Sequence, residues 1–395
     1  MENFEYYSPS KIVFGNGKFS KLGEEVAVYG TRALLIEQEG PLEELGVYTK
    51  ALDCMKEKGV LVFELDGILS NPRLSKIEEG VKIAKKKKIE VIVAVGGGSS
   101  IDTAKAIAVG ACDQGDIWDF FAGTRKVENG LPVIAVSTIS ATGAETSCHC
   151  VVTNDRDKDR SQWKKWALHD DKVFPKTAII DPELLTSVPQ RLTAAGMADS
   201  ISHILEGYFD GAQDNPISDY IGEGIIKAIL ESDRVLKHPD DISARSVIAW
   251  AATLAMSSLQ DCGRWNAGWP AHWIQHAVGA LTDSSHGEGL AVINPAWLEF
   301  DNRENPQKYM QFAKNVFGIK RSSKMTDIEY GQSGLQALKD KFKSWGLPTT
   351  IEELGVSEEM IPAIVEKVMS NNEDYEFQPE RVKAVLESCL KSHKE

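Results

Sequence analysis

The stretch that decides the fold is residues 90–105, EVIVAVGGGSSIDTAK. Its β-branched run at 91–95 predicts a buried strand, three glycines end that strand, and residues 101–109 have the spacing of a helix. Glycines let the backbone approach a bound group closely, and the amides at a helix start point toward an anion. The turn therefore suits a pyrophosphate. A tight turn without a ligand is the alternative, because the sequence is neither GxGxxG nor a P-loop.

The same strand–helix alternation extends on both sides of this turn. Helical spacing at 42–58 and 74–88 separates further short apolar runs, which predict buried strands at 33–36, 60–63, 133–136 and 177–180. Strands alternating with helices predict a mostly parallel sheet covered on both faces, which is an α/β domain.

The pattern changes after about residue 188. Long segments of helical period follow, at 191–209, 216–236, 242–260, 270–281, 306–317 and 333–345, and β-branched runs almost vanish. We therefore predict two domains: an α/β domain over residues 1–188, able to bind a dinucleotide, and an all-helical domain over residues 189–395.

Composition and charge restrict the partners of the chain. It has 395 residues and a formal net charge of −14, which disfavours nucleic acid and anionic membranes as main partners. No apolar run is long enough to span a bilayer, and the N-terminal residues have no signal core. The six cysteines are scattered and show no CxxC spacing, so we expect a reduced, cytoplasmic protein.

A second polar turn follows the strand predicted at 133–136. It reads STISATGAE over residues 137–145, and the hydroxyls of Thr138 and Thr142 beside Gly143 are candidate nucleotide contacts. Ser and Thr are common in any loop, so this signal alone is weak.

Four histidines and one aspartate have spacings typical of a metal site. Asp199 and His203 are four apart on a predicted helix and share a face, His272 and His276 are also four apart, and His286 follows. One carboxylate and three imidazoles, from Asp199, His203, His272 and His286, suit Fe(II) or Zn(II). The alternative is that these residues cap or bridge helices separately.

The other aromatic and imidazole groups are interpreted more simply. His149, His169, His238 and His393 lie in polar sequence and are expected at the surface or in loops. The tryptophans near His272 fit either helix packing or an apolar wall around a substrate; they are Trp265, Trp269 and Trp273.

With these residues in view, the chain resembles the iron-containing (group III) alcohol dehydrogenases, and within them the butanol dehydrogenase-like branch. The resemblance covers nearly the whole chain. Its motifs are PSKIVFG at 9–15, GGGSSIDTAK at 96–105, TISATGAE at 138–145, TAAGMADSISH at 193–203, and the spacing His272-x3-His276-x9-His286.

The resemblance implies a role for each matching position. Asp199, His203, His272 and His286 would bind the divalent metal, Fe(II) or Zn(II), and His276 would be the catalytic proton relay. The cofactor-binding positions would be Asn71, Gly97, Gly98, Ser99, Asp102, Thr138, Thr142, Lys165 and Leu185. The implied activity is reversible hydride transfer between a small alcohol or aldehyde and a nicotinamide cofactor, in a homodimer.

Several positions depart from the branch pattern. Residues 36–41 read IEQEGP instead of a glycine-rich stretch, and Glu39 falls where NAD-using relatives carry Asp. A carboxylate bonds a ribose 2′-hydroxyl and repels a 2′-phosphate, so we predict NAD over NADP. Ala144, Gly268 and residues 282–285 also differ, the last two near the expected substrate site.

Two other functions fit the same scaffold. One is a metal-dependent lyase or cyclase similar to dehydroquinate synthase, which would use NAD without net release of NADH. That chemistry needs several basic residues for an anionic substrate, whereas the sequence near His272 offers tryptophans and the single Arg264. The other is a catalytically silent binding protein, which the complete set of candidate ligands disfavours.

Overall fold

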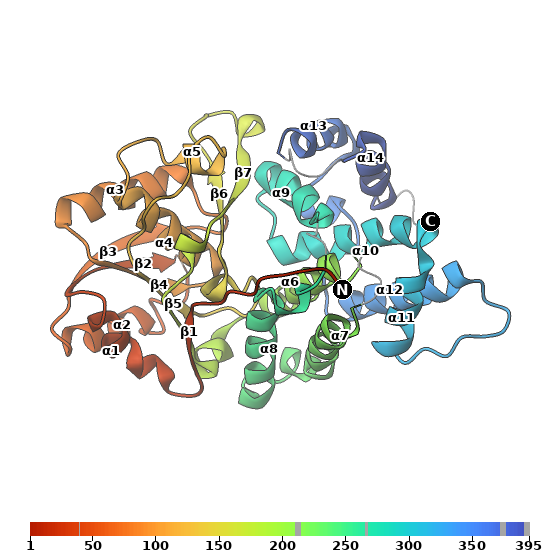
Figure 1. The fold of residues 1–395 in the computed structure, drawn as a ribbon, viewed down its shortest axis with the longest axis horizontal. Coiled ribbons are helices and arrows are strands. Elements are labelled where there is room, and N and C mark those ends of the chain that lie inside the picture. The colour runs from red at the N-terminus through yellow and green to blue at the C-terminus, as the bar shows by residue number, and fades with distance from the viewer. Residues whose placement is uncertain (39, 210–214, 265–267, 372–376, 391–395) are drawn as a thin grey trace. The chain divides into compact units, whose positions relative to one another are not determined.

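The structure of the chain is a computed structural model that describes residues 1–38, 40–209, 215–264, 268–371 and 377–390 (Figure 1). Its backbone contacts divide it into two compact units. The first unit comprises residues 7–188 with 240–249, and the second comprises residues 1–6, 189–239 and 250–395.

The first unit is built on a six-stranded sheet in the order β1-β8-β5-β4-β2-β3, in which every pair is parallel. The strands are β1 (Lys11–Phe14), β2 (Arg32–Gln38), β3 (Leu61–Ile68), β4 (Val91–Gly96), β5 (Val133–Ser137) and β8 (Thr177–Ile180). The strands predicted from the apolar runs are confirmed. Strand β4 lies between β5 and β2 near the middle of the sheet, and all of its residues are buried.

Helices cover both faces of this sheet. They are α1 (Leu22–Ala27), α2 (Val47–Lys56), α3 (Leu74–Lys87), α4 (Gly98–Ala111) and the short α5 (Trp118–Phe121). Alternate residues of β2 point to opposite faces of the sheet and join different hydrophobic clusters. Leu34 packs with residues of α3 and α4, whereas Leu35 packs with residues of α1 and α2. This two-sided burial explains why the strands are nearly continuous apolar runs.

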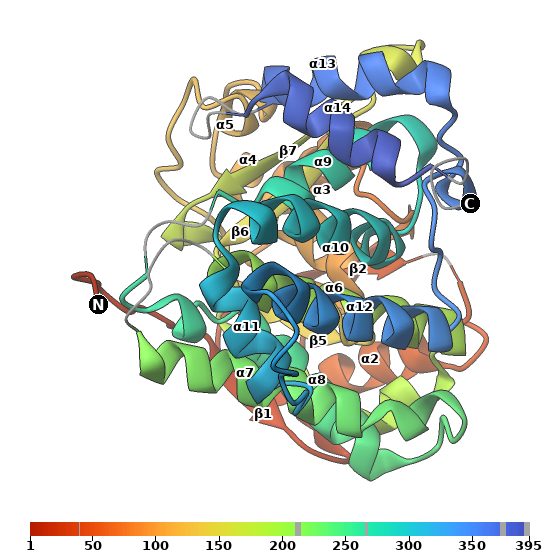
Figure 2. The same cartoon turned by 90° about the vertical axis from the view of Figure 1, so that its right-hand side faces the viewer.

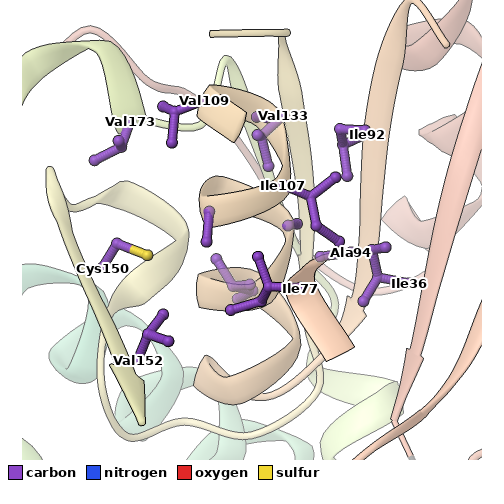
Figure 3. Close-up of a cluster of buried hydrophobic side chains, with 14 of the residues drawn as sticks. Ile36, Ile77, Ile92, Ala94, Ile107, Val109, Val133, Cys150, Val152 and Val173 are labelled. Carbon is purple, nitrogen blue, oxygen red and sulfur yellow. The ribbon is translucent and has the colours of Figure 1, made fainter. Parts of the chain in front are cut away.

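A two-stranded antiparallel hairpin, β6 (His149–Asn154) with β7 (Lys164–His169), lies against α4 and was not predicted from the sequence. Figure 3 shows Cys150 and Val152 facing α4 from the hairpin, while Ile92 and Ala94 lie on the sheet side of that helix. The alternation in β6 is hard to recognise because Cys and His occupy its first positions.

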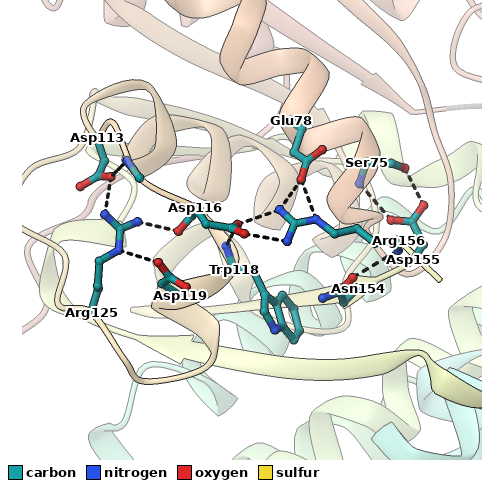
Figure 4. Close-up of polar contacts among 11 residues, drawn as sticks. Ser75, Glu78, Asp113, Asp116, Trp118, Asp119, Arg125, Asn154, Asp155 and Arg156 are labelled. Atoms are coloured by element: carbon teal, nitrogen blue, oxygen red, sulfur yellow. Dashed lines mark hydrogen bonds and ion pairs between the residues drawn. The ribbon is translucent and has the colours of Figure 1, made fainter.

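Ion pairs anchor the loop between β6 and β7. Arg156 reaches Glu78 of α3 with an Nε–Oε1 distance of 2.9 Å, and it reaches Asp116 with an Nη1–Oδ2 distance of 2.7 Å (Figure 4). Asp155 accepts hydrogen bonds from the backbone and hydroxyl of Ser75. The hairpin is thus held by charged contacts at its loop and by apolar contacts along its strands.

The second unit contains helices and, within the described residues, no strand (Figure 2). The helices of residues 189–390 are α6 (Gln190–Tyr208), α7 (Pro216–Glu231), α8 (Ile242–Ala255), α9 (Pro270–Thr282), α10 (His286–Glu304), α11 (Pro306–Asn315), α12 (Asp327–Ser344), α13 (Ile361–Asn371) and α14 (Pro379–Ser388). Residues 242–249 of α8 group with the first unit. The largely helical C-terminal half confirms that part of the predicted fold class.

Helix α10 was absent from the predicted segments. It contains Pro295, and Gly287 and Gly289 lie in its first turn, and these residues weaken a helical pattern. The helix forms because its apolar side chains are buried against α6, α9 and α12. No helix of the described residues is long and apolar enough to cross a bilayer.

Candidate metal centre and cofactor loops

Three helices of the second unit bring the four candidate metal ligands together. Asp199 and His203 lie one turn apart on α6, His272 lies on α9, and His286 is the first residue of α10. One ligand atom from each residue lies within 4.8 Å of the other three. The first three residues are buried and His286 is partly exposed.

The carboxylate of Asp199 is central to the cluster. Its Oδ1 atom lies 3.7 Å from Nε2 of His203 and 3.6 Å from Nε2 of His286. Burial, with the nearby His272, lowers the pKa of His203 well below its ordinary value, which keeps that imidazole neutral. Neutral imidazole is the form that binds a metal, so the donor set fits a divalent transition-metal ion.

Two further residues hold the imidazoles and were missed from the sequence. Oε1 of Glu206 accepts hydrogen bonds from the backbone nitrogen of His272 at 3.1 Å and from its Nδ1 at 2.9 Å. Nδ1 of His286 is hydrogen-bonded to Oε1 of Gln275. Such partners fix the ring orientation and leave Nε2 for the metal.

The helix period could have revealed both partners. Glu206 is seven residues after Asp199, and Gln275 is three residues after His272, so each lies on the same helix face as a ligand. Burial raises the pKa of Glu206 to about 8, and the backbone hydrogen bonds from His272 and Ala271 oppose that rise.

His276 lies beside the candidate ligands, and tryptophans lie beside the imidazoles. The ring centroid of His276 is 5.4 Å from that of His286 and 5.6 Å from that of Trp273. The Trp269 ring is 4.9 Å from His272, while Trp265 lies outside the described residues. Two of the three tryptophans thus lie beside imidazoles, and whether they form a substrate wall or only pack the helices stays a prediction.

In the first unit, the two polar turns lie against each other. Gly97 precedes α4, and its backbone nitrogen donates to Oε1 of Gln38 at 2.9 Å. A Cβ added to Gly98 would lie 2.5 Å from Oγ1 of Thr142, so only glycine permits this approach. The amides at the start of α4 and the Thr142 loop thus form one polar surface, with a helix start suited to an anion.

Asn71, Ser99 and Lys165 form a connected group beside this turn. The backbone nitrogen of Asn71 donates to Oγ of Ser99 at 3.2 Å, and its side-chain Oδ1 accepts from Nζ of buried Lys165 at 2.9 Å. Asn71 has a left-handed backbone with φ 60°, which Asn tolerates better than most residues. The structure thereby joins three of the predicted cofactor contacts.

Asp102 is engaged within the protein. Its Oδ2 accepts from the backbone nitrogen of Val151 in β6 at 3.0 Å, and its Oδ1 lies 3.8 Å from Nζ of Lys105. Burial raises the pKa of Asp102 to about 6, against the lowering effect of Lys105. These contacts join α4 to the hairpin, and a contact to the cofactor stays a prediction.

The remaining predicted cofactor positions differ in their surroundings. The backbone nitrogen of Thr138 donates to the carbonyl of Gly96 at 3.0 Å, and the residue is buried. Leu185, in the 3₁₀ helix Pro182–Ser187, packs with Ile180. Glu39 lies outside the described residues.

Comparison with known proteins defines the class of this chain. Residues 9–182 match the family model described as iron-containing alcohol dehydrogenase, and residues 193–390 match the C-terminal model of the same family. The chain belongs to the iron-containing alcohol dehydrogenase family. Its class of activity is that of an NAD(P)-dependent alcohol dehydrogenase or aldehyde reductase.

Individual relatives resemble the chain over almost its full length. It is 32% identical to NADH-dependent butanol dehydrogenase A of Clostridium acetobutylicum, covering 100% of both chains. It is 30% identical to the NADPH-dependent aldehyde reductase YqhD of Escherichia coli, covering 93% of both. A crystal structure named NADH-dependent butanol dehydrogenase A from Thermotoga maritima has a TM-score of 0.93 and 38% identity, with 99% of both chains covered.

Proposed function

We propose that this chain is a metal-dependent dehydrogenase that prefers NADH and interconverts small apolar alcohols and aldehydes. Asp199, His203, His272 and His286 are the proposed ligands of Fe(II) or Zn(II). The observation that carries the proposal is the convergence of these four donors, from three helices, within 4.8 Å. We also propose, from family resemblance, that the enzyme is a cytoplasmic homodimer.

The donor set suits this chemistry. A bound divalent ion supplies Lewis acidity to an alcohol or carbonyl oxygen, and a nicotinamide supplies or accepts hydride. Glu206 and Gln275 orient the imidazoles of His272 and His286, so the ligand geometry is fixed before substrate binds. We assign His276 to move the alcohol proton toward solvent, a role that suits an imidazole near neutral pH.

The cofactor preference is supported by acidic residues at the end of β2. Glu37 is partly buried, and burial together with the charges of Glu64 and Asp66 raises its pKa to about 7. Glu39 follows two residues later in the sequence. A 2′-phosphate would meet the negative charges of Glu39, Glu64 and Asp66, whereas a ribose hydroxyl could donate to a carboxylate.

The substrate proposal rests on the side chains around the imidazoles. Trp269 and Trp273 lie beside His272 and His276, and such rings favour an apolar alcohol over a charged one. Several relatives are named butanol dehydrogenases, which agrees with a short aliphatic chain. Arg264 forms an ion pair with Asp219, with an Nη2–Oδ1 distance of 2.8 Å. This pairing disfavours binding of an anionic substrate by Arg264.

The test is NADH oxidation with a series of aliphatic aldehydes after anaerobic loading with Fe(II) or Zn(II). We expect metal-dependent oxidation, faster with NADH than with NADPH. His272→Ala should lose the ion of this centre and turnover together, whereas His238→Ala, a change at an exposed histidine, should keep both. Full activity of metal-depleted His272→Ala would overturn the ligand assignment, and product formation without net NADH change would favour the lyase alternative.

A further inference from the structure

A second cluster of metal-binding side chains lies in the first unit, at the open end of the β6–β7 hairpin. His149 and His169 are directly paired across the two strands, and Cys148 immediately precedes β6. One ligand atom from each of the three lies within 4.8 Å of the other two. Both histidines were expected at the surface or in loops. His169 is exposed, as expected, whereas His149 is half-buried, and both lie on paired strands and not in loops.

Two of the donor pairs in this cluster have separations close to those of a tetrahedral zinc site. Sγ of Cys148 lies 3.7 Å from each ring nitrogen of His169, and Nδ1 of His169 lies 3.4 Å from Nδ1 of His149. Zn–S bonds of about 2.3 Å and Zn–N bonds of about 2.0–2.1 Å place sulfur and nitrogen about 3.5 Å apart, and two nitrogens about 3.4 Å apart, in tetrahedral geometry. Small side-chain adjustments would therefore complete the ligand set.

We propose that Cys148, His149 and His169 form a second metal site, which binds Zn(II) or another thiophilic divalent ion with water as the fourth ligand. One thiolate with two imidazoles is softer than the Asp199 centre, which has no sulfur. The exposed His169 gives an ion access from solvent. Cys148 lies near the negative charges of Asp170 and Asp171 and near the positive charge of Lys105, so the proposal rests on the donor geometry and not on the local charge. This proposal does not depend on the catalytic one.

Metal binding at this place would hold the two strands together at the end opposite their connecting loop. Binding releases the thiol proton of Cys148 to solvent as the sulfur–metal bond forms. The hairpin already meets α4 through Val151 and Asp102, and through Nζ of Lys105, which donates to the carbonyl of His149 at 2.7 Å. The ion would therefore fix a segment that also carries Lys165.

Cobalt(II) titration of the metal-free full chain tests the proposal, because cobalt bound to thiolate gives a sulfur-to-metal charge-transfer band. We expect two Co(II) per chain and that band in the wild type. Cys148→Ser and His169→Asn should each bind one Co(II), and Cys148→Ser should lack the band. Cys112→Ser removes an exposed free thiol as the matched control and should keep both features.

The Asp199→Asn variant separates the two centres. It should lose the ion held by the imidazole-rich centre while the charge-transfer band persists. Zn(II) should also slow amide exchange in β6 and β7 of the wild type, and this protection should vanish in His169→Asn, a change at an exposed side chain. A single Co(II) per wild-type chain, or a band that survives in Cys148→Ser, would overturn the proposal.

Discussion

Glu206 shows how one buried carboxylate prepares a metal ligand. The same Oε1 accepts the backbone N–H and the Nδ1–H of His272, so this oxygen carries no proton and the imidazole presents Nε2 to the centre. We expect Glu206→Gln to keep the fold and to weaken metal binding by about 10- to 100-fold, as for other such partners. Competition with a chelator measures this affinity. Glu231→Gln, an exposed change, is the control, and equal affinities would show that Glu206 has no orienting role.

Glu39 carries the sequence-based prediction of cofactor choice. Glu39→Gly removes a carboxylate that would accept from a ribose 2′-hydroxyl and would oppose a 2′-phosphate. We expect the ratio of kcat/KM for NADH over NADPH to fall about tenfold, which corresponds to about 1.4 kcal/mol. Glu57→Gln changes the same charge at an exposed position after α2 and should leave the ratio unchanged. An unaltered ratio in Glu39→Gly would remove this residue from the specificity argument.

At the scale of elements, Gly287 sets the spacing between α10 and α6. A Cβ at this position would lie 2.0 Å from the carbonyl oxygen of Ala195, so the helices must separate to admit alanine. We expect Gly287→Ala to cost about 1–3 kcal/mol of unfolding free energy and to weaken metal binding, because His286 is the adjacent residue. Urea unfolding and metal titration measure the two effects.

Gly224→Ala is the matched control for that change. Gly224 lies in α7 with open space around the added methyl group, so this variant should gain about 0.5–1 kcal/mol through helix propensity. If both glycine variants behaved alike, the close crossing of α10 and α6 would not be what positions His286.

Asp102, which connects α4 to the hairpin, should make the free energy of unfolding depend on pH. The folded pKa of Asp102 is about 6, above its ordinary value of 3.8, so the folded state binds more protons than the unfolded state between these values. Stability from this group is therefore present below about pH 4 and falls as pH rises through 6, by up to about 3 kcal/mol. Asp102→Asn keeps an acceptor for the Val151 backbone N–H and removes the loss of stability that accompanies ionisation of Asp102.

Unfolding free energies of wild type and Asp102→Asn, measured in urea at about pH 4 and about pH 7, test this cost. We expect the unfolding free energy of the variant to increase relative to that of the wild type as the pH rises. A difference that is the same at both pH values would mean that Asp102 has the same pKa in the folded and unfolded states.

The elements differ in how far their sequences predict them. The β4–α4 turn is encoded within consecutive residues, 90–105, and was predicted correctly. Helix α10 contains Pro295 and depends on burial against other helices, and the β6–β7 hairpin depends on packing against α4. Likewise, the spacing of Asp199 and His203 was visible along one helix, whereas the pairing of Glu206 with His272 depends on how α6 and α9 pack. Local signals were sufficient where the decisive contacts are local.

At the scale of the whole molecule, the two compact units should respond to different ligands. The proposed catalytic ligands come from α6, α9 and α10, all in the second unit, whereas the candidate nucleotide contacts lie in the first. A ligand stabilises the part of the chain that must be folded to bind it, by about 2.7 kcal/mol at one hundred times its dissociation constant. We therefore expect Zn(II) to slow amide exchange in α6, α9 and α10, and NADH to slow it around β4 and α4.

Hydrogen exchange in the His169→Asn background measures these responses without the second metal site. Adding Asp199→Asn should abolish the zinc-dependent protection of α6, α9 and α10 and leave the NADH-dependent protection of α4 intact, because the two sets of contacts share no residue. Zinc-dependent protection that persisted without Asp199, or that appeared only in the first unit, would contradict the assignment of the metal centre to these three helices. The pattern of protection would then identify which elements bind the ion.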